Sequence, residues 1–130
     1  TPVGLGIDIV SISRVASIIA RRGLAKFAGR ILNENELKDF ASKDFSHARA
    51  IEYRQAGMSK NNFTNHRFAC KEAAFKAIPF NVAGLSLKNI KITRQDECGK
   101  LHIDSICSIQ FLASITHNGD YAAASVLAMK

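Results

Sequence analysis

The sequence lacks several features that mark other classes of protein. No apolar run among its 130 residues approaches the roughly 18 that cross a membrane. No secretory signal is visible in the given sequence, which also shows no internal repeat, low-complexity tract or flexible linker, and its only prolines are Pro2 and Pro79. We therefore expect one continuous domain over residues 1–130 with no membrane partner. We expect it in the cytoplasm, or alternatively in a mitochondrial or other organelle matrix.

Cysteine is also scarce and is not arranged for metal binding or cross-linking. Cys70, Cys98 and Cys107 are odd in number and share no C-x-x-C spacing. This excludes a disulfide framework and a zinc motif. We expect inert, reduced thiols in an intracellular compartment.

Acidic residues are fewer than basic ones and are unevenly spaced along the chain. The chain has 18 Lys and Arg against 11 Asp and Glu, a formal charge of +7. No acid lies between Asp8 and Glu34. This stretch holds a basic cluster with one aromatic residue, namely Arg14, Arg21, Arg22, Lys26, Phe27 and Arg30. The cluster fits a solvated face or a docking surface for an acidic partner. Nucleic acid also fits the charge, but no phosphate-loop, dinucleotide or helix-turn-helix signature accompanies it.

The hydrophobic periodicity predicts an α+β fold, with an N-terminal strand, then helices, then an antiparallel meander. A capping box is expected at Asn33 and Glu36, and a hairpin turn at 118–120. The expected strands are 3–10, 85–87, 90–92, 101–103, 109–116 and 121–129, with a turn at 97–100. The first expected helix is capped by Ser11 or Ser13 and stops at Gly23. The others are 24–31, 34–41, 46–55 and 62–78, the last of them the strongest and ended by Pro79.

Asp8 stands inside an apolar strand, between Ile7 and Ile9. A carboxylate there is either at an edge facing solvent or binds a cation. Glu72 and Lys76 are four residues apart and share one face of the strongest helix. That face is either solvated or part of a phosphoryl-transfer site. In such a site, Asp8 and Glu72 hold Mg²⁺ while Lys76 and Arg67 neutralise phosphate oxygens.

The histidines give a weaker signal. His117 lies at the end of a strand beside a tight turn, where it is either structural or catalytic. His47, His66 and His102 have no ligand spacing, so we expect structural roles for them.

Three blocks of sequence, in order, resemble the holo-acyl-carrier-protein synthase family, the small type of 4′-phosphopantetheinyl transferase. Residues 6–10 with Arg14 are similar to its G-x-D-I-V-x-x-x-R opening. Residues 67–77 are similar to its R-F-A-x-K-E-A-x-x-K-A helix, and residues 114–117 with Tyr121 to its S-I-[ST]-H hairpin. The match spans nearly the whole chain.

The resemblance implies the phosphopantetheinyl transferase fold, with the meander packed on a long helix, and a Mg²⁺-dependent reaction. A serine of an acidic apo acyl carrier protein would take phosphopantetheine from coenzyme A, releasing adenosine 3′,5′-bisphosphate. It also implies a homotrimer with active sites at subunit interfaces and a place in fatty acid biosynthesis.

The family's site residues carry over by motif. Asp8 and Glu72 would be metal ligands, and Asp8, Glu72 and Lys76 would act in catalysis. The implied coenzyme A contacts are Arg67, Lys71, Lys76, Thr116 and His117. The implied carrier contacts are Arg14, Arg21, Lys26, Phe27 and Arg30.

One stretch departs from the family. Where relatives carry a glycine-rich loop after this helix, residues 78–84 read IPFNVAG. Pro79 has no N–H to donate to a phosphate, and Val82 resists a positive φ. A relative that binds the carrier or coenzyme A without transferring the group therefore remains an alternative, with a nucleic-acid-binding module as a second one.

Overall fold

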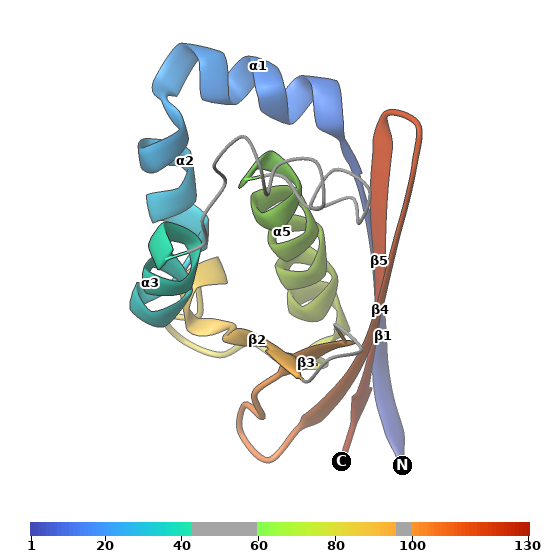
Figure 1. Cartoon of the computed structure of the whole chain (residues 1–130). Helices are drawn as coiled ribbons and strands as arrows, with labels where there is room; N and C mark the ends of the chain where they lie inside the picture. The colour runs from blue at the N-terminus through green and yellow to red at the C-terminus, as the bar shows by residue number, and fades with distance from the viewer. Residues whose placement is uncertain (43–59, 96–99) are drawn as a thin grey trace.

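The computed structural model describes residues 1–42, 60–95 and 100–130. An antiparallel three-stranded sheet forms one wall, with the strand order β1 (Pro2–Ser11), β5 (Tyr121–Met129) and β4 (Gln110–Asn118). Helix α5 (Lys60–Ala77) runs along one face of this sheet. Helices α2 (Leu24–Ile31) and α3 (Glu34–Ser42) lie on the far side of α5, and α1 (Ile12–Arg22) crosses beyond its end (Figure 1). This arrangement confirms the α+β prediction.

Small residues bring α5 close to the sheet. Its buried face consists largely of alanines, and the facing side of β5 carries alanines at alternate positions. On β1, a Cβ atom added to Gly6 would overlap the carbonyl of Ala73, and one added to Gly4 would overlap that of Ala77. Glycine at these two positions therefore lets the helix backbone contact the strand directly, which places the side chains of both elements within reach of one another.

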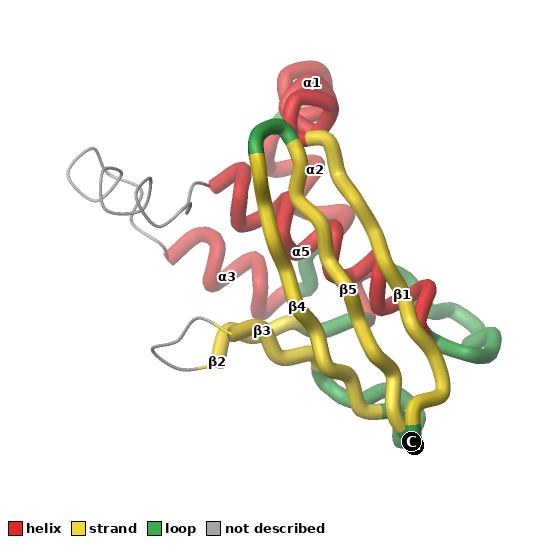
Figure 2. Tube along the Cα trace, turned by 90° about the vertical axis from the view of Figure 1, so that its right-hand side faces the viewer, coloured by secondary structure: helices red, strands yellow, loops and turns green. Residues whose placement is uncertain are grey.

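The other face of the sheet is open. In Figure 2 the three strands lie in front of the helices, and no described element covers them. Leu5, Ile7 and Ile9 of β1 and Leu112 of β4 are large, exposed apolar residues. The register brings Leu5 and Leu112 to either side of Leu127 on β5. Side chains opposite one another share a face, so these residues form an apolar surface, which we call the open sheet face.

The helix starts and stops follow their local signals. Ser11 caps α1 by accepting a hydrogen bond from the Arg14 amide, and Gly23, with φ +87°, ends it. The capping box is confirmed, because Asn33 and Glu36 exchange backbone-to-side-chain hydrogen bonds of 3.2 and 2.9 Å at the start of α3. None of the described helices is long and apolar enough to cross a membrane.

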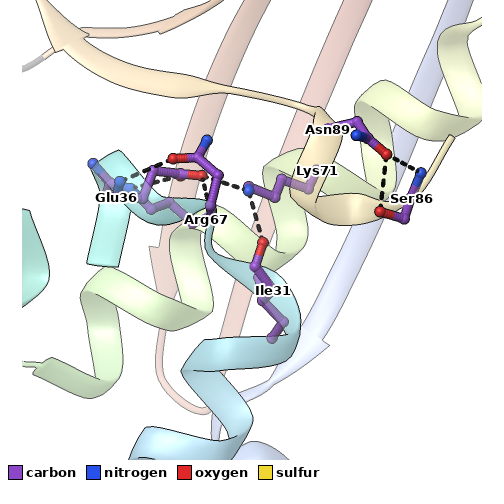
Figure 3. A network of polar contacts seen from close by, with 7 residues as sticks. Ile31, Glu36, Arg67, Lys71, Ser86 and Asn89 are labelled. Carbon is purple, nitrogen blue, oxygen red and sulfur yellow. Dashed lines mark hydrogen bonds and ion pairs between the residues drawn. The ribbon is translucent and has the colours of Figure 1, made fainter. Parts of the chain in front are cut away.

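The strand expected at residues 85–87 is wrong, and the one expected at 90–92 is only partly right. Leu87–Asn89 forms a short 3₁₀ helix, η1, and β2 (Ile92–Gln95) begins only at Ile92. The cause is local: Oδ1 of Asn89 accepts from the amide and hydroxyl of Ser86, at 2.8 and 2.9 Å (Figure 3). Such side-chain bonds compete with strand pairing.

The remaining strand predictions hold. β2 pairs with β3 (Lys100–Ile103), and β4 and β5 form the expected hairpin around Gly119. The helix expected at 46–55 and the turn residues 97–99 lie outside the described residues.

Candidate active site

Asp8 and Lys76 form the contact around which the candidate site is built. Nζ of Lys76 lies 2.8 Å from Oδ1 of Asp8 and 3.2 Å from the carbonyl oxygen of Ile7. The Asp8 side chain is 15% exposed and that of Lys76 52%. The hydrogen bond to Asp8 raises the pKa of Lys76, so its charge persists above the usual range. The close packing of α5 on β1 makes this contact possible.

Glu72 lies one turn before Lys76 and shares a hollow of about 240 Å³ with Asp8. The walls of this hollow, which we call the carboxylate hollow, include Ser11, Arg14, Ile18 and Phe68. Burial and the negative charge of Asp8 raise the pKa of Glu72, while Lys76 opposes this effect. Two carboxylates that repel each other would both be stabilised by a cation between them.

The donor set of this hollow fits Mg²⁺. The described residues contain no cluster of three or more His, Cys, Asp or Glu side chains. A cation in the carboxylate hollow would therefore take two carboxylates from the protein and fill its other positions with water or substrate oxygens. Mg²⁺ commonly binds through one or two carboxylates in this way, together with phosphate oxygens.

Arg67 and Lys71, which the sequence motif assigned to coenzyme A, have a different environment. Both side chains are buried. Nζ of Lys71 lies 2.6 Å from Oε1 of Glu36 and 2.7 Å from the carbonyl oxygen of Ile31, and Nε of Arg67 lies 3.3 Å from Oε2 of Glu36 (Figure 3). Neither residue lines the carboxylate hollow. Within one chain these cations join α5 to α2 and α3, so they present no charge to a cofactor at the surface.

Thr116 and His117, although adjacent on β4, lie on opposite faces of the sheet. His117 pairs with the buried Ala122, on the side of α5, and its ring stacks on His66 with centroids 5.4 Å apart. Thr116 lies on the open sheet face, opposite Ala123. A ligand bound to this one chain would not touch both residues from the same side.

Most of the basic cluster lines a second hollow, of about 290 Å³, between α1 and α2. Arg21, Lys26 and Arg30 are exposed, whereas Phe27 is buried at 8% exposure against the ring of Phe68. We call this hollow the basic groove; its lining is Ile18, Arg21, Arg22, Lys26, Phe27, Arg30, Ile31, Phe68 and Leu87. Arg14 lies apart from it, in the carboxylate hollow. Ile18 and Phe68 line both hollows, so the basic groove adjoins the two carboxylates.

Two acidic residues, Glu36 and Asp120, were not identified as functional from the sequence. Glu36 was expected only as a capping residue, and Asp120 only as part of a turn. Their partners are distant: Glu36 contacts Lys71, and Asp120 contacts Ser11 and Ser13. No local pattern reveals either contact. The gap in acidic residues at the start of α1 was the one available signal for Asp120.

Comparison with known proteins shows the family to which the chain belongs. Residues 4–126 match the family model of the 4′-phosphopantetheinyl transferase superfamily. The chain is 37% identical over 129 residues to the holo-[acyl-carrier-protein] synthase of Bacillus subtilis, covering 95% of this chain and 93% of that protein. It is 38% identical over 127 residues to the enzyme of the same name from Anoxybacillus flavithermus, covering 96% and 93%.

Solved structures give the same result. The holo-[acyl-carrier-protein] synthase from Neisseria meningitidis superposes with a TM-score of 0.72 at 33% identity over 98% of both chains. The Bacillus anthracis synthase in complex with CoA (3′,5′-ADP) also has a TM-score of 0.72, at 28% identity, covering 98% of this chain and 96% of that one. This chain belongs to the 4′-phosphopantetheinyl transferase superfamily, and within it the holo-[acyl-carrier-protein] synthases are its relatives.

Proposed function

We propose that this protein is an enzyme that transfers 4′-phosphopantetheine from coenzyme A to a serine of an apo acyl carrier protein. The observation that carries the proposal is the meeting of Asp8 and Glu72 at a hollow that adjoins the basic groove, with Lys76 hydrogen-bonded to Asp8. The relatives are named for this activity, and one related structure is described as a complex with CoA (3′,5′-ADP). The product, an acyl carrier protein that bears phosphopantetheine, would serve in fatty acid biosynthesis.

The reaction needs charge neutralisation more than covalent chemistry. The carrier serine oxygen forms a bond to the β-phosphorus of coenzyme A, and the bond from that phosphorus to the departing adenosine 3′,5′-bisphosphate breaks. Asp8 and Glu72 would hold Mg²⁺, which would neutralise charge on the pyrophosphate. Lys76, kept protonated beside Asp8, would stabilise negative charge on the phosphate oxygens. The serine proton would pass to Glu72 or to water beside it.

The carrier partner would dock on the basic groove. Its exposed cations, Arg21, Lys26 and Arg30, attract an acidic protein, and Phe27 provides an apolar floor. Arg14, which lines the carboxylate hollow, would contact the part of the carrier nearest its serine. The groove adjoins the hollow, so a carrier seated in the groove can direct a serine toward the two carboxylates.

We further propose that three copies assemble through the open sheet face. Exposed Leu5, Ile7, Ile9 and Leu112 form an apolar surface of the kind that marks an interface. Thr116 lies on that face, so assembly would bring it, and with it part of the coenzyme A site, to a subunit boundary. His117, at the same end of β4, would complete the cofactor contacts. Arg67 and Lys71 would support α5 from within rather than bind coenzyme A.

A reducing compartment suits the protein, and we propose the cytoplasm. Cys70 is a buried thiol, and Cys107 is an exposed one without a disulfide partner among the described residues. Unpaired thiols of this kind are typical of proteins kept in a reducing environment.

The direct test is mass analysis of apo acyl carrier protein incubated with the enzyme, coenzyme A and Mg²⁺. The wild type should add one phosphopantetheine per carrier, and chelation of Mg²⁺ should stop the transfer. Asp8→Asn and Glu72→Gln should each lower kcat about 10²-fold or more, since each removes a ligand of the ion that neutralises the transferring group. Glu34→Gln, which removes an exposed acid elsewhere, is the matched control. Binding of carrier and coenzyme A without any gain in mass would instead indicate a non-transferring relative.

A further inference from the structure

Asp120, in the turn between β4 and β5, is bonded to the start of α1 through both its backbone and its side chain. Its carbonyl oxygen accepts from the Ile12 amide at 2.7 Å. Its carboxylate accepts from the Ser13 amide at 2.9 Å, the Ser13 hydroxyl at 2.7 Å and the Ser11 hydroxyl at 3.0 Å. Residues more than a hundred positions apart are thus joined at one point.

These contacts satisfy the N–H groups that a helix leaves unpaired at its start. The Ile12 and Ser13 amides donate hydrogen bonds to the carbonyl and carboxylate oxygens of Asp120. The Arg14 amide donates to the hydroxyl oxygen of Ser11. Helix α1 has no acidic residue in its first turn and ends in Arg21 and Arg22. Asp120 therefore supplies, from another part of the chain, the negative charge that favours a helix N-terminus.

The Asp120 contacts lie where β1 ends and α1 begins, between the carboxylate hollow and the basic groove. On one side of Ser11, β1 carries Asp8; on the other side, α1 carries Arg14 and Arg21. Ser11 and Arg14 both line the carboxylate hollow. The direction in which α1 leaves the strand therefore sets the distance between the basic residues and the two carboxylates.

Among the residues that the structure describes, little else holds α1 in that direction. Val15 is its one buried residue, and Ile18 and Ile19 are only partly buried against the core. A helix with so few buried side chains depends on its polar end contacts for its orientation. The strongest of these are the hydrogen bonds that the Asp120 carboxylate accepts, since hydrogen bonds to an ionised acceptor are stronger than those between neutral groups.

We propose that Asp120 is a positioning residue that holds α1 in the orientation needed for productive docking of the carrier protein. This inference rests on the proposed function. It assigns to the β4–β5 turn a part in carrier use, although Asp120 itself need not touch the carrier, coenzyme A or the metal.

The test compares Asp120→Ala and Asp120→Asn with the wild type in steady-state transfer to apo acyl carrier protein. Asp120→Ala removes contacts that stabilise the start of α1. It should raise KM for the carrier about five-fold or more, while KM for coenzyme A stays within two-fold. Asp120→Asn, which keeps an oxygen acceptor but loses the charge, should have a carrier KM between those of the wild type and Asp120→Ala. Asp104→Asn is the matched control, because Asp104 is an exposed acid that contacts His102 and lies away from α1.

Amide hydrogen exchange gives a second readout that does not depend on catalysis. The Ser13 and Arg14 amides should exchange faster in Asp120→Ala and not in Asp104→Asn. Unchanged exchange, or a loss of kcat or thermal stability with an unaltered carrier KM, would overturn the inference.

The two proposals fail in different ways. A wild-type enzyme that neither binds nor modifies apo carrier would refute the proposed function and the docking part of the inference together. An active wild type whose Asp120 variants keep the normal carrier KM would refute the inference alone.

Discussion

Nζ of Lys71 lies 2.6 Å from Oε1 of Glu36 in the interior, although the two residues are 35 positions apart in the chain. Lys71 is fully buried, and its pKa is lowered by that burial, with Glu36 acting against the shift. The same carboxylate pairs with Arg67, and the Lys71 ammonium also binds the end of α2 at Ile31. Lys71 and Glu36 thus tie α5 to α2 and α3, and Lys71 directly precedes Glu72, the residue that would hold the metal, in the chain.

Glu36→Gln should therefore destabilise the protein strongly. It would leave the buried ammonium of Lys71 without the carboxylate that faces it, which typically costs about 3–5 kcal/mol of the free energy of unfolding. Urea denaturation followed by circular dichroism would measure this. The exposed neighbour variant Glu34→Gln should change the free energy by less than about 1 kcal/mol. Equal losses in both variants would contradict a special role for the buried pair.

Gly6→Ala should disturb the contact between β1 and α5. The added methyl group would overlap the backbone carbonyl of Ala73, so the helix must shift, at a cost of about 1–3 kcal/mol in stability. Since Asp8 and Lys76 meet across this contact, kcat should fall as well. In Gly29→Ala the new methyl group meets no atom within 4 Å, and this variant should be neutral or more stable by about 0.5–1 kcal/mol. Thermal melting together with the transfer assay would separate the two variants.

Cys70 should resist alkylation in the folded protein while Cys107 reacts. Burial raises the pKa of the Cys70 thiol to about 12, so its reactive thiolate is scarce even in mildly alkaline solution. Between its ordinary pKa of 9.0 and about 12, the unfolded thiol loses its proton and the folded one keeps it, so this group lowers stability as the pH rises. Iodoacetamide labelling of Cys98→Ser protein, read by peptide mass analysis, should modify Cys107 at pH 8 and Cys70 only after denaturation. Rapid native labelling of Cys70 would disprove this.

Leu112→Lys should prevent self-association. It places a charge on the open sheet face without altering the side of the sheet that packs on α5. Light scattering on a sizing column should give a trimer for the wild type and a monomer for the variant, with transfer activity lost in parallel if the site is shared. Ser105→Lys introduces the same charge at an exposed position off this face and should remain trimeric. A trimeric Leu112→Lys protein would show that the open sheet face is not the interface.

Arg21→Glu should weaken carrier use but not coenzyme A binding. Reversing an exposed charge in the basic groove should raise KM for the carrier about five-fold or more and flatten its dependence on salt. Calorimetric affinity for coenzyme A should stay unchanged. A fall in that affinity would mean that the basic groove binds the cofactor instead of the carrier.

Much of the fold could be predicted from the sequence because its signals are local. The helix ends at Ser11 and Gly23, the capping box at Asn33 and the hairpin at Gly119 all depend on residues a few positions apart. The α+β class followed from the change in hydrophobic period. The strand expected at 85–87 was wrong because the side-chain bonds between Ser86 and Asn89 outweigh the alternation of apolar residues.

The sequence by itself determined which residue types were available: a lone aspartate in an apolar strand, a glutamate and lysines on one helix, and a basic stretch without acids. Only the tertiary structure decided what each charge does. It pairs β1 with β5, brings Lys76 to Asp8, and turns Lys71 and Arg67 inward to Glu36. The physical reason is that the effect of a charge depends on its burial and its partners, and both are set by packing between segments far apart in the chain.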